Sequence, residues 1–70
     1  MQYTSEDIEI GMEYIGSDNT FVATIDDIEN GIVISHITKY EFGIPPNKSY
    51  TDTLESVLDM LNTGQWLIKD

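Results

Sequence analysis

The chain of 70 residues contains no cysteine and no arginine, and it has only two prolines and three lysines. Without cysteine, neither disulfide bonds nor a thiolate metal site can stabilise the protein. A domain of this size buries only about 60% of its unfolded surface, so nearly all of the chain must contribute to one core. We therefore expect a single domain over residues 1–70.

Long apolar segments are also missing. No apolar run approaches the ~18 residues that a membrane-spanning helix requires. The N-terminus, MQYTSEDIEIG, has neither a basic region nor the apolar stretch that follows it in a secretory signal. These absences predict a cytoplasmic protein that does not associate with membranes.

Negative charge is the strongest feature that is present. Thirteen acidic residues outnumber three lysines, which gives a formal net charge of −10. Eight of these acids lie in residues 1–38, which contain no lysine or arginine at all. Such a field repels nucleic acid and anionic membranes and attracts basic surfaces. We therefore expect a basic protein surface as the partner, and no direct binding of nucleic acid.

The first segment, SEDIEIGMEY, alternates with a period of two. Ile8, Ile10, Met12 and Tyr14 share one parity, whereas Asp7, Glu9 and Glu13 share the other. This pattern predicts a strand over residues 5–15 with an apolar side facing the core and an acidic side facing out.

Two further strands are predicted around a strong turn signal. Asn30-Gly31 is typical of a two-residue hairpin, and it separates strands predicted over residues 20–28 and 31–42. Counting alternate residues from this turn predicts one shared inward face: Phe21, Ala23, Ile25, Ile32, Ile34 and His36.

The second half predicts a loop, a helix and a short strand. The adjacent prolines place a loop at residues 43–50. An apolar stripe with helical spacing predicts a helix over 52–62, which Asp52 and Glu55 would cap. A closing strand is expected at 65–69. The stripe is Leu54, Val57, Leu58 and Leu61.

The order of these elements predicts the α+β class. A three-stranded antiparallel meander cannot bury its apolar face alone, and neither can the single C-terminal helix, so each should pack on the other. The short last strand would then close one edge. Two architectures satisfy this order: an SH3-like, partly open barrel, or a helix lying across an antiparallel sheet.

The sequence contains few residues that are suited to catalysis. His36 could act as a general base or a pH switch, but we expect a partly buried strand histidine with a local hydrogen bond. The segment DDIENG resembles the start of an EF-hand loop, yet Ile28 and Ile37 stand where that loop needs oxygen ligands. We therefore predict no enzyme activity, no catalytic residue, no cofactor and no metal.

These observations favour a small acidic, non-enzymatic protein-interaction module. It could be an inhibitor or DNA mimic of the kind encoded by phages and mobile elements, binding a basic, nucleic-acid-associated protein. The alternative is a structural or accessory domain that self-associates or docks to a subunit through an exposed sheet face or edge. The chain would be a monomer or a weak homodimer. The predicted partner-binding residues are Asp7, Glu9, Glu13, Asp26, Asp27 and Glu29.

Overall fold

The Asn30-Gly31 turn forms as predicted in the computed structural model, which describes residues 2–69. Both residues have positive φ angles, 51° and 76°, as a type I′ turn requires. The turn joins strand β2 (Phe21–Glu29) to strand β3 (Ile32–Tyr40), and Glu29 pairs with Ile32. This hairpin is the centre of the sheet.

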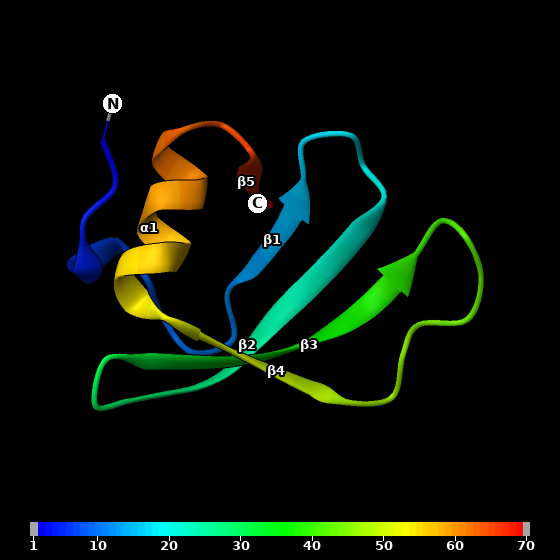
Figure 1. Ribbon diagram of the computed structural model, residues 1–70, viewed down its shortest axis with the longest axis horizontal. Coiled ribbons are helices and arrows are strands. Elements are labelled where there is room, and N and C mark those ends of the chain that lie inside the picture. Colours follow the sequence, from blue (N-terminus) through cyan, green and yellow to red (C-terminus); the bar gives the residue numbers. More distant parts are fainter. Residues whose placement is uncertain (1, 70) are drawn as a thin grey trace.

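The described residues form a five-stranded antiparallel sheet with one α-helix on one face (Figure 1). The strand order is β4-β3-β2-β1-β5. This arrangement confirms the α+β class and agrees with a helix lying across a sheet. The remaining elements are η1 (Ser5–Asp7), β1 (Glu13–Gly16), β4 (Ser49–Thr53), α1 (Leu54–Asn62) and β5 (Trp66–Lys69).

Helix α1 crosses the sheet because it connects β4 and β5, which lie at opposite edges. Its N-cap is Thr53, whose hydroxyl oxygen accepts a hydrogen bond from the Ser56 backbone N–H at 3.1 Å. The predicted cap at Asp52 is therefore wrong by one residue, because β4 extends to Thr53. Gly64, with φ of 81°, allows the chain to turn back after the helix.

The core lies between α1 and the sheet. The predicted helix stripe is confirmed, since Val57 and Leu61 are buried and its other two leucines pack against the core. The sheet contributes four nearly inaccessible residues to the same core: Tyr14, Ala23, Ile25 and Val33. Burying the side chain of Ile25 or Val33 stabilises the fold by about 1.5–3 kcal/mol relative to exposure.

Two irregularities in the β2–β3 pairing change which residues face the core. The register shifts once between Ile25 and Asp27 and once opposite Val22 and Ala23, so Asp26 and Thr38 are extra residues in their strands. Each extra residue reverses the parity that follows it. The inward residues of β3 are therefore Val33, Ser35 and Ile37, and the predicted inward positions of Ile32, Ile34 and His36 are wrong.

The N-terminal segment also differs from its prediction. Residues 5–7 form the short helix η1, and β1 begins only at Glu13. The Thr4 backbone N–H donates to the Asp7 carboxylate at 2.8 Å, which favours a turn over an extended strand. Gly11, with φ of 89°, then redirects the chain into β1. The alternation of residues 7–10 is thus not that of a strand.

The helix is too short to cover the whole sheet face. Nine helical residues span about 14 Å, whereas the nine residues of β2 or β3 extend for about 30 Å. The helix-side face toward Phe21 and Tyr40 is therefore left without a helix above it (Figure 1). Among residues 2–69, no helix is long and apolar enough to cross a membrane.

Candidate functional site

The six carboxylates predicted to bind a partner do not share one face. Glu13 lies on the outer sheet face, the face opposite α1, where it pairs with Thr24 and Lys69. Asp26 is the extra residue of β2 on that same face. Asp7 belongs to η1, Glu9 to the segment before β1, and Asp27 and Glu29 to the hairpin end of β2.

The fold instead gathers acids at one end of the molecule, from three separate segments. The Leu54 backbone N–H donates to the Gly31 carbonyl at 2.7 Å, which ties the start of α1 to the β2–β3 turn. Helix η1 packs against α1, and all three segments lie on the left in Figure 1. We call this region the acidic end; its residues are Glu6, Asp7, Glu29, Glu55 and Asp59.

No lysine, arginine or histidine is present in the segments that form the acidic end. Lys39 and Lys48 lie beyond it, at the far end of β3 and in the loop 41–48 that occupies the right side of Figure 1. Over residues 2–69 the one salt bridge joins His36 to Asp26. Within residues 2–69, no lysine, arginine or histidine side chain forms an ion pair with a carboxylate of the acidic end.

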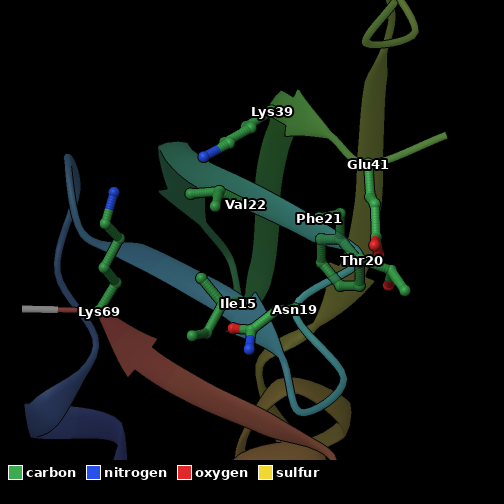
Figure 2. Close-up of a pocket in the computed structure, with 8 residues that line it drawn as sticks. All are labelled: Ile15, Asn19, Thr20, Phe21, Val22, Lys39, Glu41 and Lys69. Carbon is green, nitrogen blue, oxygen red and sulfur yellow. The ribbon is translucent and has the colours of Figure 1, made fainter. Parts of the chain in front are cut away.

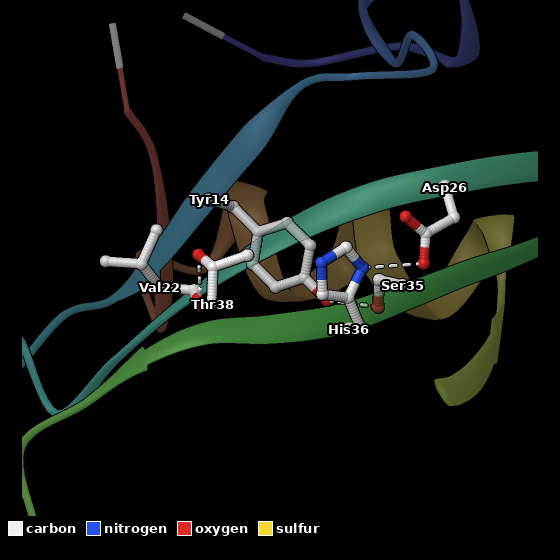
Figure 3. A network of polar contacts seen from close by, with 6 residues as sticks. All are labelled: Tyr14, Val22, Asp26, Ser35, His36 and Thr38. Atoms are coloured by element: carbon white, nitrogen blue, oxygen red, sulfur yellow. Dashed lines mark hydrogen bonds and ion pairs between the residues drawn. The ribbon is translucent and has the colours of Figure 1, made fainter. Parts of the chain in front are cut away.

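His36 points to the outer face and not into the core. Its Nδ1 lies 2.7 Å from the Asp26 carboxylate, and the side chains are 41% and 39% exposed (Figure 3). The expected local hydrogen bond is confirmed, but the inward position is wrong because Asp26 is the bulged residue. An exposed pair of this kind contributes about 0–1 kcal/mol. No third catalytic group is hydrogen-bonded to the pair among the described residues.

A depression of about 410 Å³ lies on the outer face, at the end nearest Lys39 (Figure 2). The apolar side chains of Ile15 and Val22 form its floor, and Lys39 and Lys69 flank that floor. Val22 faces outward whereas Val33 is buried under α1, so these two side chains lie on opposite faces of the sheet.

A second cavity, of about 220 Å³, opens on the helix-side face that α1 leaves uncovered. Four aromatic rings surround it, and Asp52 is its one charged residue. The lining consists of Tyr14, Phe21, Ala23, Ser35, Ile37, Tyr50, Asp52 and Trp66. We call this the aromatic cavity.

Two of the aromatic rings are held in place by each other. Tyr14 and Trp66 stack with centroids 4.7 Å apart, and Phe21 meets both rings edge-on. Trp66 therefore belongs to the margin of the core and also lines a cavity. Sequence alternation predicted that Tyr14 faces inward, but it could not show that the helix stops short of this part of the sheet.

Tyr14 and Ser35 form the polar back wall of the aromatic cavity. Their hydroxyl oxygens lie 2.9 Å apart, joined by a hydrogen bond (Figure 3). Burial raises the pKa of the Tyr14 phenol above its ordinary value of 10.0; the Ser35 hydrogen bond opposes this effect and the nearby Asp52 carboxylate adds to it. Tyr14 is therefore a neutral hydrogen-bonding group at physiological pH.

Local hydrogen bonds lower the pKa of the Asp18 carboxyl group. Hydrogen bonds from the Thr20 hydroxyl and then the Thr20 backbone N–H lower the pKa of the Asp18 carboxyl below 3.8. The interaction closes the turn between β1 and β2. This carboxylate is thus structural.

The described residues contain no group of three or more His, Cys, Asp or Glu side chains arranged to hold a metal ion. Comparisons with protein-family models, curated proteins and solved structures gave no match. Charge, exposure and the chemistry of the cavities are therefore the features of this protein that bear on its function.

Proposed function

We propose that this protein is a small acidic interaction module that binds a basic surface of a partner protein through its acidic end. The observation that carries the proposal is the segregation of charge. Three segments that lie together at one end carry five carboxylates and, within residues 2–69, no lysine, arginine or histidine, whereas Lys39 and Lys48 belong to segments toward the other end. Such a dipolar molecule orients as it approaches a cationic surface and associates faster than a neutral one.

We propose more specifically that the chain is a DNA mimic. Its partner would be a nucleic-acid-binding protein, and the chain would cover the basic surface with which that partner binds nucleic acid. Exposed carboxylates on a rigid scaffold present negative charge as a phosphate backbone does. Asp26 and Asp27, next to the acidic end on β2, extend the negative surface along the strand. A basic protein so occupied would be inhibited in its binding to nucleic acid.

The test begins with affinity capture of partners from a native lysate at about 0.1 M and 1 M salt, because an electrostatic complex dissociates as the screening length falls. The purified partner is then titrated with two double variants of equal net charge. Glu29→Gln with Glu55→Gln removes two charges from the acidic end. Glu9→Gln with Glu41→Gln removes two charges outside it.

We expect the first double variant to weaken binding about tenfold and the control to weaken it less than threefold. Duplex DNA should compete with the wild-type chain for the partner. Equal losses in the two variants, or binding that survives 1 M salt, would contradict the role of the acidic end. If the partner binds this chain but duplex DNA does not compete, only the proposal of a DNA mimic is contradicted.

A second candidate function is self-association through the outer sheet face. Leu67, Ile15 and Val22 lie side by side across three strands, and Leu67 is 46% exposed. No described element covers this row. Sedimentation of the wild type and of Leu67→Lys distinguishes the candidates, since a dimer formed here would be insensitive to salt and lost in the variant.

A further inference from the structure

The aromatic cavity has the composition of a site for an organic cation. Four aromatic rings line it, and the face of an aromatic ring attracts a cation within about 6 Å of its centroid. The Asp52 carboxylate supplies the one full charge in the lining. None of the hydrogen bonds or ion pairs found within residues 2–69 uses the Asp52 side chain, so its acceptor oxygens remain available to a ligand.

The size of the cavity restricts its occupant. Its 220 Å³ is below the roughly 300–1,000 Å³ typical of sites for drug-sized ligands and cofactors. It is suited to a group the size of one amino-acid side chain. The stacked Tyr14 and Trp66 rings and the Tyr14–Ser35 hydrogen bond hold the walls in place, so the cavity is formed before any ligand enters.

One contact within the protein already shows the affinity of this region for cations. The Lys48 ammonium lies 4.9 Å from the centroid of the Tyr50 ring, whose side chain lines the cavity. Lys48 itself is not part of the lining. The rim of the cavity thus pairs an aromatic ring with a positive charge in the absence of a partner.

We propose that the aromatic cavity accepts one arginine side chain of the basic partner, with its guanidinium stacked on the aromatic wall and hydrogen-bonded to Asp52. A guanidinium is planar, donates to both oxygens of a carboxylate and gives up water more easily than an ammonium does. These properties match a cavity with several rings and one carboxylate. The inference extends the proposed function, since it names the side chain by which the basic partner is anchored.

The first experiment uses arginine without the partner. N-acetyl-arginine amide is titrated into the full chain while the fluorescence of Trp66, the single tryptophan, and its indole N–H resonance are recorded. N-acetyl-citrulline amide is the neutral isostere, and N-acetyl-lysine amide carries the same charge without the planar group. We expect saturable millimolar binding of the arginine probe, at least fivefold weaker binding of lysine, and none of citrulline.

Matched variants test the carboxylate. Asp52→Asn removes the charge with little change of shape and should weaken arginine binding roughly threefold to tenfold. Glu41→Gln, at the exposed position after β3, removes one charge outside both the cavity and the acidic end and should leave binding unchanged. Lys48→Met removes the competing cation from the rim and should strengthen binding about twofold.

The inference is overturned if citrulline binds as well as arginine, if lysine matches arginine, or if Asp52→Asn and Glu41→Gln behave alike. An unchanged or weaker affinity of Lys48→Met would place the probe elsewhere. Failure here is separable from failure of the proposed function. If partner binding depends on Glu29 and Glu55 but not on Asp52, the acidic end binds the partner and the aromatic cavity does not. If partner binding depends on Asp52 but not on Glu29 and Glu55, the aromatic cavity binds the partner and the acidic end does not.

Discussion

The hydroxyl oxygens of Tyr14 and Ser35 lie 2.9 Å apart between β1 and β3, two strands that are not neighbours in the sheet. The side chains reach across the intervening strand β2, where Ala23 is small enough to leave room. Tyr14 is 4% and Ser35 2% exposed, so each hydroxyl has lost most of its contact with water. The pair fixes the back wall of the aromatic cavity.

Ser35→Ala is expected to destabilise the protein by about 1–3 kcal/mol, because the buried Tyr14 hydroxyl loses its partner. Urea-induced unfolding measures the change in free energy. The double variant Tyr14→Phe with Ser35→Ala leaves neither hydroxyl unpaired, so its loss should be smaller than the sum of the two single losses. Strict additivity of the two changes would contradict this account.

Stability should fall at high pH through Tyr14. Because burial raises the folded-state pKa of this phenol above 10.0, the folded protein holds the proton more tightly than the unfolded chain does. This contribution is complete below pH 10 and is lost as the pH rises from 10 through the folded-state pKa. Chemical unfolding between pH 8 and 11 should show a smaller fall in Tyr14→Phe than in the wild type; identical slopes would refute the linkage.

Thr53→Ala should cost about 1 kcal/mol, since the first turn of α1 loses the side chain that accepts from the Ser56 N–H. Thermal or urea unfolding would show the change. Thr53→Ser keeps the oxygen and is the matched control, expected within about 0.5 kcal/mol of the wild type. A loss in the serine variant as large as in the alanine variant would mean that the methyl group matters and the cap does not.

Gly16→Ala should disturb the aromatic cluster. An added Cβ would lie 2.9 Å from a carbon of the Phe21 ring and 3.0 Å from the Asp18 carboxylate, so the ring must move. We expect a loss of about 1–3 kcal/mol, as for other overpacked sites, and a weaker near-ultraviolet dichroism signal. Combining Gly16→Ala with Phe21→Leu should recover part of the loss. Ser17→Ala, at an exposed neighbour, should change neither property.

Local signals in the chain were sufficient for most of the elements. Asn30-Gly31 predicted the central hairpin, because both residues accept the positive φ angles that the turn demands. The spacing of Val57 and Leu61 predicted the buried face of α1. These features depend on residues within a few positions of one another, which is the range that a sequence pattern describes.

Alternation can predict which residues of β3 face the core only if the β2–β3 pairing has no bulge. Asp26 and Thr38 each add one residue to a strand, and nothing in their identity distinguishes a bulged residue from an ordinary strand residue. The same limitation placed His36 inward and Ser35 outward. Pairing of β4 with β3 likewise requires the partner strand, because Ser49–Thr53 is polar and follows two prolines.

The sequence by itself determined the α+β class, the central hairpin, the helix with its apolar stripe, and the excess of negative charge. Only the tertiary structure decided where that charge gathers, because Glu29 and Glu55 approach when the start of α1 bonds to the Gly31 carbonyl. It alone also decided that the aromatic cavity exists. A nine-residue helix cannot cover strands of about 30 Å, and the uncovered part of the sheet brings Asp52 beside the rings of Tyr14 and Trp66.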